Sequence, residues 1–249
     1  MFRKYRKNFF SQNGEDGVIL EILKRLKLNK NNSWCCEFGA WDGIHGSNTF
    51  NLVKHLDYNA IYIEGDKKKY TDLLNNCKKY KKIIPIRKYV SYKKNSSNLL
   101  DKILKKTKIV KNFNVLSIDI DSFDLQIWRS LKKYRPKIVV IEINSGIPLG
   151  VKQTHNPPKI GNSFTSTVEY ATKNNYQLVC HTGNCIFIDK KYVKKLKINK
   201  KFLKNKNANL LFDTTWFSKK EFFLKRLARL LLHKTIIDFL RQIKIKINL

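Results

Sequence analysis

The chain has 249 residues, of which 42% are apolar. This content is enough to build a core and excludes a wholly disordered or collagen-like chain. Lys and Arg outnumber Asp and Glu by 51 to 19, and the resulting net charge of +32 suits a polyanion or an anionic membrane as partner. A Lys- and Asn-rich composition also arises at neutral surface positions in AT-rich genomes, so the charge alone does not identify a partner.

Several other classes of protein are disfavoured by the sequence. The five cysteines form no CxxC pair, which argues against a disulfide framework or a zinc site. There is no run of about 18 apolar residues, so no membrane-spanning helix is expected. Polar residues 11–16 interrupt the basic N-terminus before a secretory core could form. We therefore expect a cytoplasmic protein.

Short apolar runs alternate with helical patterns from the N-terminus as far as Ile143. An amphipathic helix is predicted at 14–28, with an apolar face formed by every third or fourth residue. Because the strand candidates are continuously apolar and separated by helices, they predict a parallel sheet buried on both faces. The predicted strands are 34–38, 61–64, 83–86, 115–120 and 138–143, and the helices between them are 45–56, 67–80, 96–107 and 123–133.

The pattern changes after the fifth strand. A Pro- and Gly-rich loop at 148–161 precedes a helix at 163–174, and two further strands at 176–180 and 185–188 flank a short Gly-Asn turn. Five parallel strands closed by an antiparallel hairpin are the plan of class I S-adenosylmethionine-dependent methyltransferases. We predict an α/β, Rossmann-like, mostly parallel seven-stranded sheet with a C-terminal antiparallel hairpin.

The C-terminal part of the chain differs in composition from the rest. Residues 190–249 hold 18 basic and 3 acidic side chains, and 217–247 have the pattern of basic amphipathic helix. We therefore predict a methyltransferase-like domain at 1–190 and a basic, partly helical C-terminal extension at 191–249. The extension would either pack on the core or on a second subunit, or lie on an anionic membrane surface.

A Gly-containing turn follows the first strand. Gly39 and Gly43 would let the backbone approach a ligand closely at the carboxyl end of that strand, where open α/β sheets bind their ligands. Glu64 ends the second strand and could accept hydrogen bonds from both ribose hydroxyls of a nucleoside cofactor. The alternatives are a tight turn without a ligand for the glycines and a helix cap for the carboxylate.

Oxygen-bearing side chains end the fourth and fifth strands. Asp119 and Asp121 follow the fourth strand, and Glu142 and Asn144 follow the fifth. Asp121, Glu142 and Asn144 could hold a divalent cation, Mg²⁺ or Mn²⁺, or one carboxylate could act as a general base. Helix capping by Asp121 or Asp124 is the structural alternative. His155, in the Pro-rich loop, is a further candidate base.

An ordered set of motifs resembles the FkbM-type branch of the methyltransferases, some of which O-methylate sugars. The resemblance covers about residues 11–189, and Ser122 stands where that branch has Gly. It implies S-adenosylmethionine as cofactor, with Asp119 or Asp121 near the transferred methyl and with a binding site formed by Glu37, Gly39, Ala40, Gly43, Asn48, Glu64 and Asp119. The motifs are Ser11–Gly17, Glu37–Gly43 with Ser47–Thr49, Ile63–Asp66, Leu116–Asp121, Val140–Asn144 and Gly161–Ser163.

Three functions are compatible with these features. The leading one is an O-methyltransferase acting on a sugar hydroxyl of a glycan or glycolipid, either as a monomer or as a homo-oligomer. The second is a nucleic-acid-binding protein or RNA methyltransferase that uses the basic surface, although no RNP motif or zinc knuckle is present. The third is an inactive domain peripheral to a membrane, which the intact Gly turn and acidic residues disfavour.

Overall fold

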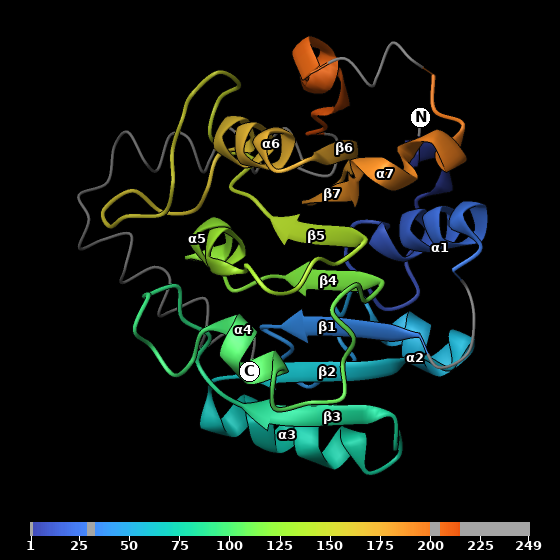
Figure 1. Ribbon diagram of the computed structural model, residues 1–249, viewed down its shortest axis with the longest axis vertical. Coiled ribbons are helices and arrows are strands. Elements are labelled where there is room, and N and C mark those ends of the chain that lie inside the picture. The colour runs from blue at the N-terminus through green and yellow to red at the C-terminus, as the bar shows by residue number, and fades with distance from the viewer. Residues whose placement is uncertain (1, 29–32, 200–204, 215–249) are drawn as a thin grey trace, which may run out of the picture. The chain divides into compact units, whose positions relative to one another are not determined.

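The computed structural model describes residues 2–28, 33–199 and 205–214. Its centre is a seven-stranded sheet in the order β3-β2-β1-β4-β5-β7-β6 (Figure 1). All pairs are parallel except those that β7 makes with β5 and β6. The predicted fold class, a Rossmann-like class I methyltransferase sheet closed by an antiparallel hairpin, is confirmed. The strands are β1 (Trp34–Phe38), β2 (Asn59–Glu64), β3 (Ile83–Arg87), β4 (Val115–Ile118), β5 (Ile138–Glu142), β6 (Tyr176–His181) and β7 (Asn184–Asp189).

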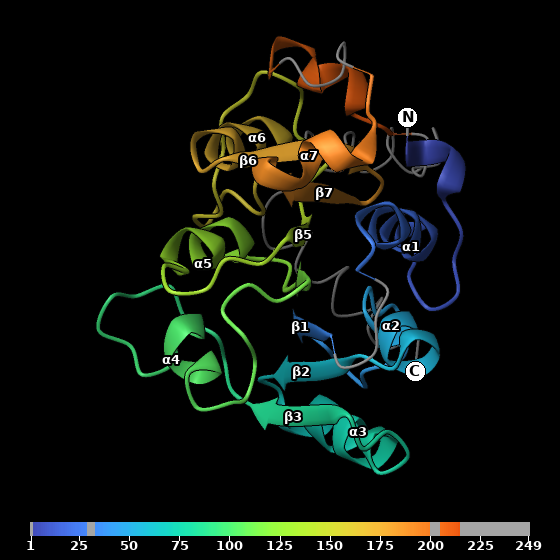
Figure 2. The same cartoon turned by 45° about the vertical axis from the view of Figure 1, so that its right-hand side comes forward.

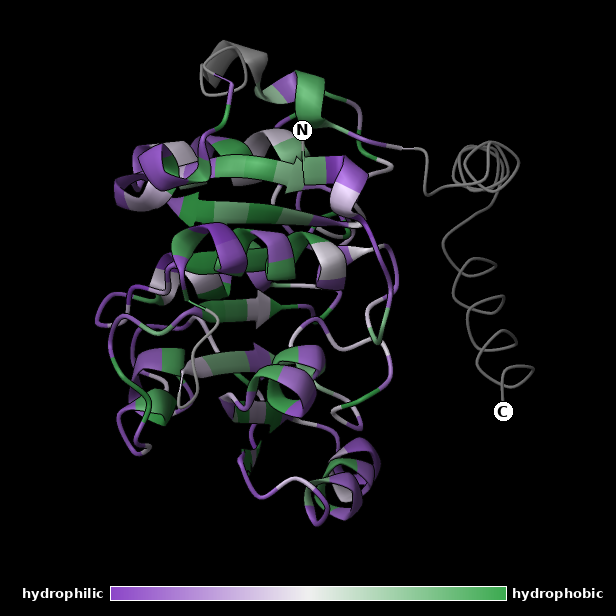
Figure 3. Ribbon diagram, turned by 90° about the vertical axis from the view of Figure 1, so that its right-hand side faces the viewer, coloured by the Kyte–Doolittle hydropathy of each residue, from purple (hydrophilic) through white to green (hydrophobic). Residues whose placement is uncertain are grey.

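Helices cover both faces of this sheet (Figure 2). Because successive strand residues point to opposite faces, Cys35 joins the core beneath α1, α2 and α3, while Cys36 joins the core beneath α4, α5 and α6. Hydrophobic residues accordingly gather in the strands, and hydrophilic ones lie along the helices (Figure 3). The helices are α1 (Glu15–Leu26), α2 (Phe50–Leu56), α3 (Lys67–Cys77), α4 (Leu100–Leu104), α5 (Asp124–Ser130), α6 (Phe164–Lys173) and α7 (Lys190–Val193).

The predicted helices between the strands are shorter than their sequence patterns indicated, and two of them, α2 and α4, differ most. α2 begins at Phe50 rather than at residue 45, because the side chain of Glu37 accepts hydrogen bonds from Ser47, Asn48 and Thr49 and holds them in a turn. α4 covers Leu100–Leu104 within the predicted 96–107. In both places side-chain and turn hydrogen bonds replace the helical ones.

The compact unit that contains the sheet extends past residue 190 to Asp213. The carboxylate of Asp213 is buried and forms ion pairs with Arg3 at 3.2 Å and Arg6 at 3.1 Å. Its backbone N–H donates to Nδ1 of His181, and burial lowers the pKa of this histidine to about 3. These contacts join the first and last described segments of the unit.

The predicted amphipathic helix at 217–247 lies outside the described residues. Among the helices that are described, none combines the length and the apolar character needed to cross a bilayer.

Candidate active site

Four functional candidates lie in one row at the carboxyl edge of the sheet. Phe38 is in register with Ile63 on one side and with Ile118 on the other, and Ile118 is in register with Ile141. The residues that directly follow these four are therefore also side by side across the sheet. They are Glu64, Gly39, Asp119 and Glu142, and they form the row. The strand order reverses at β1, because β2 and β3 lie on one side of it and the chain then crosses from β3 to β4 on the other side. This row therefore lies at the switch point where open α/β sheets bind ligands.

Gly39 is required by the close approach of β1 and β4. Its φ is +75°, and a Cβ at this position would lie 1.8 Å from the carbonyl oxygen of Asp119. The backbone N–H groups of Gly39 and Ala40 both donate to the carbonyl of Ile63, so the turn is tied to β2 as well. Gly43, with φ +77°, leaves room for the side chain of Leu73. These contacts explain the glycines by packing, and Gly39 is itself exposed at the switch point.

Glu37 organises the segment that follows this turn. It is 3% exposed, and its carboxylate accepts hydrogen bonds from the hydroxyls of Ser47 and Thr49 and from the backbone N–H of Asn48. Burial raises the pKa of Glu37, while these donors counteract the rise. The side chain of Asn48 is turned toward β4, where its Nδ2 donates to Ser117 Oγ at 3.1 Å. Glu37 and Asn48, which were both predicted to bind the cofactor, therefore use their side chains to hold this segment in place.

Glu64 has two residues with exposed aromatic side chains near it, Trp41 and Tyr89. Its carboxylate accepts hydrogen bonds from the backbone N–H of Trp41 at 2.9 Å and of Asp66 at 2.8 Å. A carboxylate has about four lone-pair positions, so further donors can be accepted. The ring of Tyr89 lies against Gly65, because a Cβ added to Gly65 would be 2.3 Å from this ring. Tyr89 is 70% exposed. Trp41, at 48% exposure, adopts φ +46°.

Asp119 and Glu142 form a half-buried carboxyl pair. The two side chains hydrogen-bond to each other, and burial raises the pKa of both. Neighbouring negative charge, including that of Asp124 and Asp121, raises them further. A pair of this kind retains a shared proton at a pH where separate carboxylic acids have lost theirs. The predicted convergence of these carboxylates at the strand ends is therefore present.

The loop after β4 is fixed by Asp124. Its carboxylate accepts hydrogen bonds from the backbone N–H groups of Ile120 and Ser122, both at 2.9 Å. Asp121 adopts the left-handed backbone conformation, with φ +59°. Ser122, which stands where a glycine was expected, donates its hydroxyl to the carbonyl of Ile120. The turn therefore forms without the expected glycine. Asp121 is exposed, and the cap position of α5 is occupied by Phe123.

The predicted divalent-cation site of Asp121, Glu142 and Asn144 is not supported. Within the described ranges, no group of three or more His, Cys, Asp or Glu side chains is placed to hold a metal ion. The Asn144 amide is used in its own loop, because Nδ2 donates to the carbonyl of Ile160 and Oδ1 accepts from Gly146. Glu142 is paired with Asp119, so the predicted set does not assemble around a common centre.

His155 connects the Pro-rich loop to α5. Its Nδ1 accepts a hydrogen bond from the backbone N–H of Gly161 at 3.1 Å, and its ring packs edge-on against Phe123. Its backbone carbonyl accepts from Gln126. Since burial lowers the pKa of His155 and Nδ1 acts as acceptor, the ring is neutral with its proton on Nε2. In this arrangement the imidazole stabilises the loop and has no vacant nitrogen to serve as a base.

Two aromatic residues of the site carry no signal in the sequence. Tyr89 lies in the connection after β3, where the sequence has no periodic pattern. Trp41 belongs to the Gly-containing turn, but nothing in that motif assigns a role to its ring. Their high exposure beside a buried carboxylate is the signal that identifies them, and exposure is visible only in the fold.

Comparisons with known proteins add the following. No protein-family model and no curated protein matches the chain. TrmK of M. capricolum, solved with S-adenosyl-homocysteine, has 17% identity and a TM-score of 0.45, with 91% of this chain and 93% of that chain covered. A precorrin-6y C5,15-methyltransferase from Geobacter metallireducens has 12% identity and a TM-score of 0.44, with 74% and 90% covered. Likeness at this level concerns the fold alone, and the fold assignment rests on the strand order above.

Proposed function

We propose that the protein is an S-adenosylmethionine-dependent O-methyltransferase of the FkbM type. The observation that carries this proposal is the row of Glu64, Gly39, Asp119 and Glu142 across the switch point of a class I methyltransferase sheet. In this proposal Glu64 would bind the nucleoside, the Gly39 turn would lie against the cofactor, and the pair of Asp119 and Glu142 would accept a proton.

The residues at the switch point suit this cofactor. The Glu64 carboxylate would receive the ribose hydroxyls, and the exposed rings of Trp41 and Tyr89 would stack on the adenine. The backbone around Gly39 and Ala40 would lie against the remaining part of the molecule. When bound, S-adenosylmethionine supplies an electrophilic methyl group on a sulfonium.

Asp119 is proposed as the group that receives the acceptor's proton. As an acceptor hydroxyl becomes a methyl ether, its proton passes to the carboxylate of Asp119, and Glu142 holds the proton already shared by the pair. Asp121, which is exposed two residues after Asp119, would contact the acceptor. Most of the acceleration would come from holding the reacting atoms in line. A sugar hydroxyl is the acceptor that the FkbM resemblance favours.

Methylation of RNA is the second candidate. The net charge of +32 supports it, because non-specific nucleic-acid binding is carried by phosphate contacts with Lys and Arg. In the described part of the chain, exposed lysines such as Lys67, Lys68 and Lys69 follow Glu64 directly on α3. Salt-dependent binding of RNA together with methyl transfer to it would favour this candidate over a glycan acceptor.

Calorimetric titration with S-adenosylhomocysteine tests the proposal. Wild-type protein should bind, and Glu64→Ala should weaken binding by about 1–3 kcal/mol through lost charge-assisted hydrogen bonds. Asp66→Ala is the matched control, because this carboxylate caps α3 by accepting from Lys69 and lies close to Glu64 in the chain. Equal dissociation constants in wild type and Glu64→Ala would remove Glu64 from the site, and no binding to the wild type would refute the function.

A further inference from the structure

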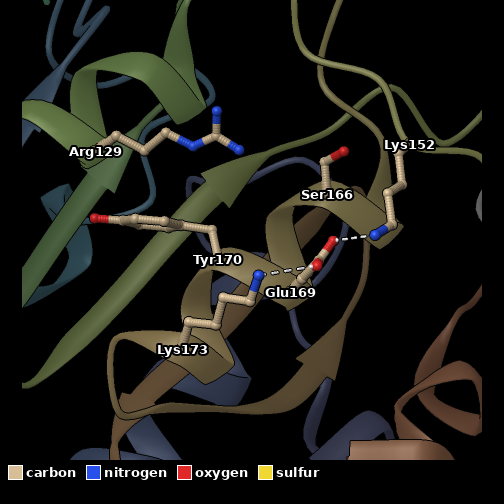
Figure 4. A pocket seen from close by; sticks show the side chains of 6 residues that line it. All are labelled: Arg129, Lys152, Ser166, Glu169, Tyr170 and Lys173. Atoms are coloured by element: carbon tan, nitrogen blue, oxygen red, sulfur yellow. Dashed lines mark hydrogen bonds and ion pairs between the residues drawn. The ribbon is translucent and has the colours of Figure 1, made fainter.

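A polar pocket lies between α5, α6 and the loop that precedes α6. Its volume is about 310 Å³, and its lining comes from the end of α5, from one loop residue and from one side of α6 (Figure 4). The lining residues are Arg129, Lys152, Ser166, Glu169, Tyr170 and Lys173. Three of these six side chains are cations and one is an anion, so the pocket is positively charged.

The Arg129 guanidinium is held in place without an anionic partner. It lies over the ring of Tyr170, 5.6 Å from the ring centroid, and the hydroxyl of Tyr170 is tied to the carbonyl of Trp128 at 3.3 Å. Among the described residues it makes no hydrogen bond or ion pair. A guanidinium presents paired N–H donors that match the oxygens of a phosphate, and stacking on a ring reduces the entropy lost on binding.

The two lysines are oriented by Glu169. Its carboxylate contacts Lys152 Nζ at 2.9 Å and Lys173 Nζ at 3.1 Å, as the dashed lines in Figure 4 show. These side chains are largely exposed, so each ion pair contributes little to stability. Their effect is to hold two ammonium groups at the pocket, where they add to the field of Arg129.

Ser166 supplies a hydroxyl at the same place. The residue is 7% exposed, and its backbone N–H donates to Ser163 at the start of α6. Its hydroxyl donates to no protein acceptor in the described ranges. A free hydroxyl donor beside an unpaired guanidinium is a combination that suits an oxyanion.

We infer that this pocket binds a phosphate group carried by the methyl acceptor, such as a sugar phosphate or a phosphate-linked saccharide. The inference rests on the proposed function and deepens it. The elements that line the pocket also border the candidate active site. α5 begins at Asp124, whose carboxylate fixes the loop after β4, and Asn162, just before α6, donates to the carbonyl of Ser122 in that loop. Arg129 follows Asp124 along α5, about 7 Å further along the helix axis. The proposal requires an acceptor long enough to reach from the carboxyl edge of the sheet to this pocket.

The experiment measures binding of inorganic phosphate, a hexose phosphate and the same hexose without phosphate to the full chain. Arg129→Gln should weaken binding of both phosphates about tenfold. Glu169→Gln should strengthen it several-fold, because a negative charge is removed from the pocket. Lys105→Gln, at an exposed position after α4, is the matched charge control and should change neither affinity. Thermal unfolding of each variant confirms that it is folded.

The outcomes separate the pocket from the proposed function. Opposite shifts in Arg129→Gln and Glu169→Gln, with an unchanged control, support the phosphate site. Equal affinities in all four proteins, or equal losses in Arg129→Gln and Lys105→Gln, overturn it. Binding of a short single-stranded RNA is measured as well. If the protein binds this RNA, per phosphate, as tightly as it binds the hexose phosphate, the assignment to a sugar-linked acceptor is overturned. S-adenosylhomocysteine should bind to each of these variants as tightly as to the wild type. If it binds neither the wild type nor the variants, the proposed function is refuted, whatever the phosphate measurements show.

Discussion

Replacing Gly39 by alanine tests the claim that this glycine sets the geometry of the candidate active site. The new Cβ would lie 1.8 Å from the carbonyl oxygen of Asp119, whereas real Cβ contacts are essentially never below 3.0 Å. The β4 backbone would have to move away until this separation reached at least 3.0 Å. Such a shift breaks the hydrogen bond from Asp119 N–H to the carbonyl of Phe38 and displaces the Asp119 side chain from its place in the row.

The expected magnitude has two parts. A left-handed backbone conformation costs about 1–2 kcal/mol for alanine. A buried backbone hydrogen bond that is lost adds about 1–3 kcal/mol. Gly39→Ala should therefore reduce the free energy of unfolding by about 2–5 kcal/mol. Gly150→Ala is the matched control, because Gly150 has φ +86° and a Cβ added there would meet nothing within 4 Å, so only the first part applies.

Urea unfolding of both variants measures the difference, and S-adenosylhomocysteine titration measures its effect on the site. Gly39→Ala should be the less stable of the two and should also bind more weakly, while Gly150→Ala should bind as wild type does. Equal stability losses in the two variants would refute the argument from close approach of β1 and β4.

Two further predictions concern carboxylates. A chain ending at residue 190 should be much less stable in thermal unfolding than one ending at 214, because only the longer chain keeps the Asp213 ion pairs with Arg3 and Arg6; equal melting temperatures would contradict this. Glu142→Gln should raise the free energy of unfolding at pH 8 by about 1–3 kcal/mol and leave it nearly unchanged at pH 4. The sign follows from the raised pKa of Glu142, because the folded state then holds more protons than the unfolded chain and the stability of the wild type falls as the pH rises above about 4. A variant that is less stable than wild type in urea at pH 8 would contradict this.

The sheet could be predicted from the sequence because its strands are continuous apolar runs. Runs such as 138–143 leave few alternatives to a strand buried on both faces, and the hairpin turn at 182–183 has an unambiguous local pattern. The strand order then brings Asp119 and Glu142 together, so the convergence of carboxylates was also predictable.

The uses of individual polar side chains were harder to predict. Asn144 and His155 have the right chemistry for a ligand and a base, yet both are used by backbone groups of the 143–163 loop. An irregular loop has many backbone donors and acceptors without secondary-structure partners, and nearby polar side chains satisfy them. Asp213 was missed for a different reason, because its partners Arg3 and Arg6 lie at the opposite end of the sequence.

The contact between Arg6 and Asp213 also sets a condition on folding during synthesis. Arg6 is synthesised before its acidic partner, which is added 207 residues later. At about 5–20 residues per second this interval is about 10–40 s. Throughout it, the emerging chain holds two N-terminal arginines without the carboxylate that later buries between them. The sheet can assemble strand by strand in this time. The ion pairs of Arg3 and Arg6 with Asp213 form only when residue 213 has left the ribosome.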